Sequence, residues 1–445
     1  MTLMSAEPRT HVQQAPHGSA EFDRLSLSHA VLLGFAFAAI SLATLQPALH
    51  GEFINDDSPL IVNHPYLNPF NPENLIAILD PFGGAAIHGV NYAPVMLLLH
   101  ALEKALFGGD TLGYHIVNAV IHALSCVLLI ALLIATRVPR IAALLAGLVF
   151  AVHPANVEAV AWISQLKTNA ALAFALGAVL SQRHHPALAL ALFALGLLTK
   201  ASAMAALPMV AALSWSRRDA SRQWIWLAGW VVVASLYAIP ELNAQVATDI
   251  SPYPDRWVQI RSIFSFWARY LVMAATSYGV SAFQEPEPVH SILDPWWIGG
   301  FWVAVLLAWR TIATLRARRA EAAYWIAAAA SFGPISQIWP FMHPMADRYL
   351  YFILPGLIGG SLLAAATFRA NWCAAISDPE ARIRWASIAS RLTAISTALV
   401  VIAFGIHSHA RATLWHEEVL LQSMILIDLE STRAQRRKAR KASTP

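Results

Sequence analysis

Two adjacent carboxylates, Asp56 and Asp57, are the residues whose types and spacing most directly suggest chemistry. Neighbouring carboxylates repel, so in a partly buried site either one has a raised pKa or both share a cation. Either state suits a general base or a metal ligand. An Asx turn led by Asn55 in a hydrated loop explains the same residues without a function. We expect Asp56 and Asp57 to be the catalytic candidates, with a divalent metal as an open alternative and no certain cofactor.

Cations lie near the predicted ends of apolar runs. Lys200 separates two such runs, and Arg348 opens another beside Asp347. Long cationic side chains at helix ends can extend to lipid phosphates, which explains both without a site. A guanidinium can also bind two phosphate oxygens at once, and for that role we expect Asp347 to hold the Arg348 guanidinium in place. Both interpretations stay open.

A polar stripe and a helix-ending motif are less specific. His115, Asn118 and His122 recur at i, i+3 and i+7, on one face of a helix. Such a stripe in a spanning helix faces protein or a cavity, and we favour packing between helices. His153-Pro154 ends another predicted helix, where a capping role explains the histidine nearly as well as a functional one.

The elements that must position these residues are membrane helices. Of the 445 residues, 57% are hydrophobic and 13% are charged, which is outside the range of soluble domains. Apolar runs that could span a bilayer fall at eleven places: 27–46, 114–136, 140–156, 168–182, 187–199, 202–215, 224–241, 296–310, 322–339, 348–368 and 391–408. We predict an all-α polytopic membrane protein with about 11 transmembrane helices.

Basic residues predict the orientation. They gather in alternate loops near residues 137, 183, 217, 316 and 382, which places those loops in the cytoplasm. The N-terminal tail 1–26 is then cytoplasmic, residues 27–410 form the membrane domain, and the basic tail 411–445 is extracytoplasmic. Basic loops also explain the net charge of +4, so we expect no nucleic-acid partner.

Two long outward segments contain amphipathic stretches, Tyr92 to Phe107 and Trp257 to Tyr270, which we expect to lie along the outer interface. Outward segments also hold most polar residues, whereas the inward loops hold mainly Arg. That asymmetry predicts an outward-facing polar cavity. No Gly-rich phosphate loop, HExxH or nucleophile elbow occurs, which argues against a cytoplasmic nucleotide-driven enzyme.

An ordered set of motifs resembles a known family. Its members are the transmembrane and tetratricopeptide-repeat protein O-mannosyltransferase-like proteins of the glycosyltransferase C superfamily. The motifs run from Phe53-Ile54-Asn55-Asp56-Asp57 through Asn91-Tyr92-Ala93-Pro94, Gly113-Tyr114-His115 and His153-Pro154 with Glu158 and Trp162, to Lys200 and Met345-Ala346-Asp347-Arg348-Tyr349. The sequence departs from the family at Ala93, at Ser164 to Asn169, and in lacking the C-terminal repeats.

The resemblance implies a glycosyltransferase C-like fold, and we expect a multi-pass protein of a bacterial inner (cytoplasmic) membrane. It implies transfer of a sugar, with mannose as a candidate, from a polyprenyl-phosphate donor to a protein or glycan acceptor on the extracytoplasmic side. Asp56 matches the catalytic acid of the family's first loop. The resemblance further assigns substrate binding to Tyr92, His153, Glu158, Lys167, Lys200, Asp347 and Arg348.

Two other classes remain as alternatives. A transporter or flippase would also place charges and broken helices in the membrane, but it predicts matching halves that this sequence does not display. A non-catalytic, family-related scaffold would explain the departures from the motifs. Comparing the lipid-linked sugars and glycans of a deletion strain with those of its parent distinguishes these classes.

The predicted topology is testable with single cysteines. One placed near Asp56, in the loop 343–347 or after residue 410 should react with a membrane-impermeant thiol reagent from outside. One at position 217 or 316 should react only after permeabilisation. Labelling of the Asp56 loop from inside would overturn the outward-facing cavity.

Overall fold

The chain folds into an all-helical bundle. The computed structural model describes residues 25–219, 221–245, 253–281, 284–339 and 343–426, so most of both terminal tails lies outside the described residues. Within these ranges the chain forms helices and no strand, apart from an isolated bridge between Gln284 and Met345. The all-α class is confirmed for the described residues.

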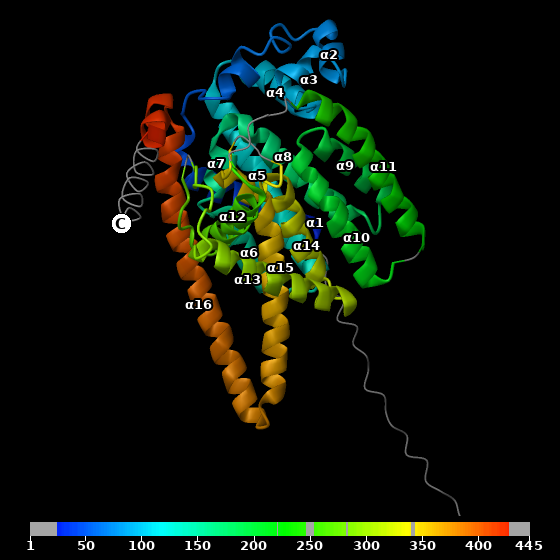
Figure 1. The fold of residues 1–445 in the computed structure, drawn as a ribbon, viewed down its shortest axis with the longest axis vertical. Helices are drawn as coiled ribbons and strands as arrows, with labels where there is room; N and C mark the ends of the chain where they lie inside the picture. The colour runs from blue at the N-terminus through cyan, green and yellow to red at the C-terminus, as the bar shows by residue number, and fades with distance from the viewer. Residues whose placement is uncertain (1–24, 220, 246–252, 282–283, 340–342, 427–445) are drawn as a thin grey trace, which may run out of the picture.

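Every apolar run expected from the sequence coincides with a helix. The helices are α1 (Leu27–Thr44), α5 (Thr111–Ala135), α6 (Arg140–Ala151), α8 (Leu166–Ser181), α9 (Pro186–Leu197), α10 (Ala206–Arg217), α11 (Ser221–Ala244), α13 (Pro295–Arg316), α14 (Glu321–Phe332), α15 (Asp347–Ala375) and α16 (Pro379–Ala412). Figure 1 shows α15 and α16 as a hairpin of long helices whose turn projects from one end of the bundle.

Seven helices among the described residues are long and apolar enough to cross a membrane. They are α1, α5, α8 with the turn before it, α11, α13, α15 and α16. The remaining four, α6, α9, α10 and α14, have 12 residues each and extend about 18 Å, against a hydrocarbon core of about 30 Å. The protein is therefore a multi-pass membrane protein, while the count of about eleven spans is not established.

A cap of short helices covers the end of the bundle opposite the α15–α16 turn (Figure 1). It contains α2 (Pro72–Leu79), α3 (Gly84–His88) and α4 (Pro94–Phe107). Both amphipathic stretches are helical: the first is α4, and the second lies within α12 (Arg256–Thr276). Their position along the outer interface stays a prediction.

The polar stripe on α5 serves packing, as expected. Asn118 donates from Nδ2 to the carbonyl oxygen of Trp162 at 3.2 Å. His122 contacts the hydroxyl of Tyr351 at 2.8 Å through Nδ1 and the carbonyl oxygen of Ala151 at 3.1 Å through Nε2. The stripe thus joins α5 to α15, to the end of α6 and to the turn after α7 (Asn156–Ala161).

Close packing of α14 on α15 fixes the start of α15. Gly356 and Gly360 form a GxxxG pair on α15, the spacing that lets two helix backbones approach in a membrane. A Cβ atom on Gly356 would lie 2.6 Å from the carbonyl oxygen of Tyr324 and 2.7 Å from the backbone nitrogen of Ala328. Since both are backbone atoms, only glycine fits there.

Gly356→Ala should therefore destabilise the protein by about 1–3 kcal/mol, the usual scale of overpacking. Gly34→Ala on α1 is the matched control, because a Cβ there meets nothing within 4 Å and the loss of a helical glycine is favourable by about 0.5–1 kcal/mol. Thermal melts in detergent measure both. Equal melting temperatures for the two variants would contradict the packing argument.

Candidate functional site

The two adjacent carboxylates have different surroundings. Asp57 is buried, and its Oδ2 accepts the N–H of Ile54 at 3.0 Å while its Oδ1 accepts the N–H of Ser164 at 2.7 Å. Burial raises the pKa of Asp57 to about 7, although the hydrogen bonds from Ile54 and Ser164 lower it. Asp57 therefore holds the turn together through these two backbone groups.

Asp56 lines a cavity instead. Its side chain is half-buried and makes no hydrogen bond within the described part of the chain. The cavity has a volume of about 830 Å³, and its charged lining residues come from distant parts of the sequence. They are Asp56, Lys167, Lys200, Glu241 and Arg348. The charge of Asp56 acts on both Lys167 and Arg348.

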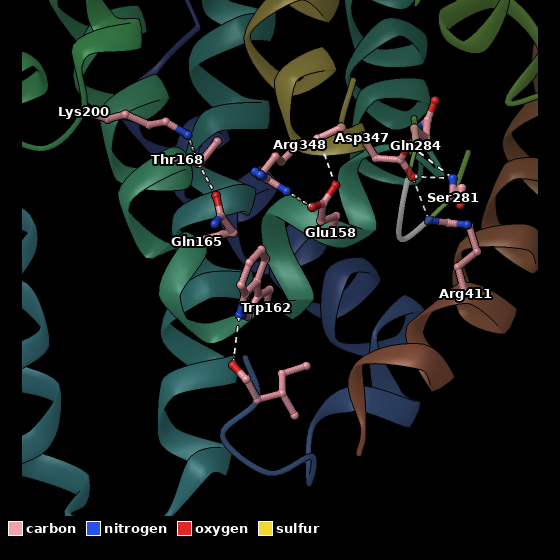
Figure 2. Close-up of polar contacts among 12 residues, drawn as sticks. Glu158, Trp162, Gln165, Thr168, Lys200, Ser281, Gln284, Asp347, Arg348 and Arg411 are labelled. Atoms are coloured by element: carbon pink, nitrogen blue, oxygen red, sulfur yellow. Dashed lines mark hydrogen bonds and ion pairs between the residues drawn. The ribbon is translucent and has the colours of Figure 1, made fainter. Parts of the chain in front are cut away.

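Lys200 is held in the cavity wall by a short chain of hydrogen bonds. Its Nζ donates to the hydroxyl of Thr168 at 2.7 Å, and that hydroxyl donates to Oε1 of Gln165 at 2.7 Å. Figure 2 shows these residues in one row beside Arg348. Lys200 adopts an extended backbone between α9 and the single turn η4 (Ala201–Ala205). The boundary between the two apolar runs in the sequence therefore corresponds to the end of one helical segment and the start of the next.

Lys167 is the cation without a described partner. It lies in the first turn of α8 and lines the cavity, and within the described residues it makes no hydrogen bond. An amine in a cavity wall that no side chain neutralises directly is available to an anion.

The Arg348 guanidinium pairs with Glu158 (Figure 2). Glu158 accepts from Nη1 of Arg348 through Oε1 and from the Arg348 backbone N–H through Oε2, the latter at 2.8 Å. The guanidinium also lies 5.6 Å from the ring centre of Trp162 and 5.0 Å from that of Tyr349, within reach of cation–π attraction. Glu158 thus tethers one nitrogen of the guanidinium, and Arg348 also lines the cavity.

The expectation that Asp347 holds this guanidinium is wrong. Asp347 accepts from Nη2 of Arg411 at 2.7 Å, from Nε2 of Gln284 at 2.5 Å and from the N–H of Ser281 at 3.1 Å. Consecutive helical residues point about 100° apart, so Asp347 and Arg348 in the first turn of α15 face different neighbours. Figure 2 shows the two side chains diverging.

Arg411 is the residue of this network that sequence analysis missed. It lies in the last turn of α16, 64 positions after Asp347, and only 8% of its side chain is exposed. One cation near the end of an apolar helix carries no pattern, so its partner becomes visible only in the tertiary structure.

Two further expected residues lie outside the cavity lining. Tyr92 lines a neighbouring apolar pocket of about 420 Å³, and its backbone N–H donates to Oε2 of Glu241 at 2.9 Å. His153 uses both ring nitrogens locally, because Nε2 donates to the carbonyl oxygen of Ala274 at 3.1 Å and Nδ1 accepts the N–H of Ala155 at 3.2 Å. Tyr92 is thereby joined to α11, and His153 to α12 (Arg256–Thr276).

A metal site has no further support. Within the described residues, no group of three or more His, Cys, Asp or Glu is placed to hold a metal ion. Asp57 also uses both of its carboxylate oxygens for backbone N–H groups.

The fold and the cavity define a class: a multi-pass helical membrane protein in which, among the described residues, the carboxylates of Asp56 and Glu241 and the cations Lys167, Lys200 and Arg348 line one cavity. The sequence is similar to curated protein O-mannosyl-transferases. It is 33% identical over 135 residues to protein O-mannosyl-transferase F38B6.6 of Caenorhabditis elegans, covering 28% of this chain and 19% of the relative. It is 32% identical over 166 residues to Tmtc1 of Drosophila melanogaster, covering 36% and 19%.

A third relative, TMTC2 of Mus musculus, is 31% identical over 151 residues, covering 33% of this chain and 18% of the relative. The resemblance noted from the motifs is therefore confirmed for the matched part, while the match extends over less than a fifth of these relatives' own length. No protein-family model matches the sequence. No solved structure matches it either.

Substitutions in the Arg348–Glu158 pair and in the Asp347–Arg411 pair should have different effects on ligand binding and on stability. Arg348→Lys should keep the fold but weaken binding of an isoprenyl phosphate about tenfold or more, because Lys loses the planar fork. Glu158→Gln should also weaken binding, since it loosens the guanidinium, and it should lower the melting temperature as well, because it leaves Arg348 without its buried partner. Asp347→Asn should mainly lower the melting temperature, because it weakens the buried partner of Arg411. Binding in nanodiscs and thermal melts measure both effects.

If Arg348→Lys binds the isoprenyl phosphate as tightly as the wild type, Arg348 is not a phosphate ligand, and its role is that of a cation that anchors the helix end in the membrane. An Asp347→Asn variant that loses affinity while melting normally would contradict the separation of the two pairs.

Proposed function

We propose that this protein is a membrane glycosyltransferase that moves a sugar from a polyprenyl-phosphate donor to a protein or glycan acceptor on the extracytoplasmic side. The observation that carries the proposal is the cavity that brings Asp56 together with Lys167, Lys200 and Arg348. The curated relatives are named protein O-mannosyl-transferases, which makes mannose the first sugar to test and a protein the first acceptor.

The carboxylate and the three cations of the cavity suit the two requirements of such a transfer, which are activation of the acceptor and stabilisation of the leaving phosphate. Asp56 takes the proton of the acceptor hydroxyl while the acceptor oxygen bonds to the anomeric carbon of the sugar. The bond from that carbon to the phosphate oxygen breaks, and the phosphate leaves with the electron pair. Lys167, Lys200 and Arg348 neutralise the negative charge that the phosphate gains. An attack opposite to the leaving group inverts the anomeric centre.

The surroundings of the cavity suit the other parts of the donor. Asn91, Glu241 and Gln245 offer amide and carboxylate groups to sugar hydroxyls. The apolar pocket beside Tyr92 shares Tyr237 with the cavity and is otherwise lined almost entirely by apolar residues of α9, α11 and the cap, which suits a prenyl chain. Membrane helices on the same wall let a lipid-linked donor enter from the bilayer.

Substituting Asp56 and Asp57 one at a time tests whether the two acids have different roles. Asp56→Asn should lower transfer from a polyprenyl-phosphate mannose donor by about two to four orders of magnitude, the scale of a general base, and leave the melting temperature unchanged. Asp57→Asn should instead destabilise the protein by about 1–3 kcal/mol, because an amide nitrogen cannot accept the second backbone N–H.

Transfer assays in nanodiscs with the wild-type protein and both variants give the answer. A fully active Asp56→Asn variant would remove Asp56 as the base. Absence of transfer by the wild type with every polyprenyl-phosphate hexose would sink the proposed function and favour a transporter or a scaffold.

A further inference from the structure

The turn that presents Asp56 is held by the opposite end of the described chain. The N–H of Glu52 donates to the carbonyl oxygen of His416 at 2.9 Å, and the N–H of Glu418 donates to Oε1 of Glu52 at 3.0 Å. The two segments meet backbone to backbone, because a Cβ on Gly51 would lie 2.6 Å from the carbonyl oxygen of Trp415. Trp415 in turn stacks on Trp162 with ring centres 5.4 Å apart.

The closest contact falls beside the candidate base. The N–H of Asn55 donates to Oε2 of Glu418 at 2.6 Å, across 363 positions of sequence. Oε1 of the same carboxylate accepts from Nε2 of Gln422, one helical turn further on, at 2.7 Å. The Glu418 carboxylate is therefore fixed at both oxygens and binds the turn through a short, charge-assisted hydrogen bond.

Asn55 also has a distinctive backbone conformation. Its φ of +48° places it in the left-handed region, which Asn adopts more readily than most other non-glycine residues. That conformation turns the chain between Ile54 and Asp56. Asp57 secures the turn from one side through the N–H groups of Ile54 and Ser164, and Glu418 secures it from the other.

We propose that Glu418 is a positioning residue for Asp56, so that the segment 413–426 after the last long helix is part of the transfer site. The inference rests on the proposed function, since it takes Asp56 as the base. The Asp56 carboxylate has no described hydrogen bond of its own, so its position depends on the backbone that carries it. Misplacing a reacting group by about 1 Å can lower the rate about a hundredfold.

Glu418→Ala and Glu418→Gln test the proposal, and Glu417→Ala is the matched control. Glu417 is the adjacent acid, 61% of its side chain is exposed, and its described ion pair is with its neighbour His416. Hydrogen exchange of the full-length protein in nanodiscs reports the contact directly. Exchange in the segment 51–57 should rise in Glu418→Ala, rise less in Glu418→Gln, whose amide oxygen can still accept from Asn55, and stay unchanged in Glu417→Ala.

Kinetics report the consequence. Glu418→Ala should lower kcat between about tenfold and a hundredfold with the KM for the polyprenyl-phosphate donor unchanged, because the cations that bind phosphate are untouched. Glu418→Gln should recover most of the rate, and Glu417→Ala should match the wild type. A thermal melt checks that each variant is folded.

Unchanged exchange in Glu418→Ala would overturn the contact itself. Raised exchange with an unchanged kcat would overturn the positioning role, as would a rise in KM that accounts for the whole loss. If the wild type transfers no sugar at all, the proposed function fails and takes the catalytic part of this inference with it. The exchange data then still decide whether Glu418 holds the turn.

Discussion

A carboxylate and a guanidinium that meet away from bulk water must satisfy each other, and the pair of Glu158 and Arg348 does so beside the cavity. Glu158 is 1% exposed, and removing one member of such a pair leaves an uncompensated charge at a cost of about 3–5 kcal/mol. Glu158 also accepts the backbone N–H of Arg348 at the start of α15, where the N-cap residue Ala346 offers no side-chain acceptor. One carboxylate therefore begins a helix and orients a cation.

The neighbouring pair of Asp347 and Arg411 extends this constraint to the end of α16. Because α15 starts with an acid and a base on different faces, it binds α7 through one and α16 through the other. The loop around Ser281 and Gln284 completes the second pair. The start of α15, which carries the cavity residue Arg348, is thus held by both α7 and α16. Figure 2 shows the two networks side by side.

The same logic separates Asp56 from Asp57. The carboxylate of Asp57 is buried and accepts two backbone N–H groups, so it has little capacity left for a ligand, whereas the carboxylate of Asp56 lines a cavity beside three cations. Asp57 stabilises the turn, and the same turn carries Asp56 at the cavity wall. The contacts of Glu418 and Trp415 with this turn mean that residues from the start and from the end of the described chain build one local structure.

The sequence alone determined the membrane character, the positions of the helices and the resemblance to the O-mannosyl-transferases, because apolar length and ordered motifs are local properties of the chain. It also identified Asp56, Lys167, Lys200, Glu158 and Arg348 as residues of interest. It did not decide how many helices span, because an apolar run marks a helix such as α6 or α9 without showing whether that helix is long enough to cross a bilayer.

Only the tertiary structure decided the partners. Asp347 lies next to Arg348 in sequence yet binds Arg411, and Glu158 reaches Arg348 across 190 positions. Tyr92 and His153 belong to the same set of motifs, yet neither lines the cavity. The physical reason is that a side chain's partner depends on the direction in which its helix or turn presents it, and that direction is fixed by packing between distant elements rather than by neighbours along the chain.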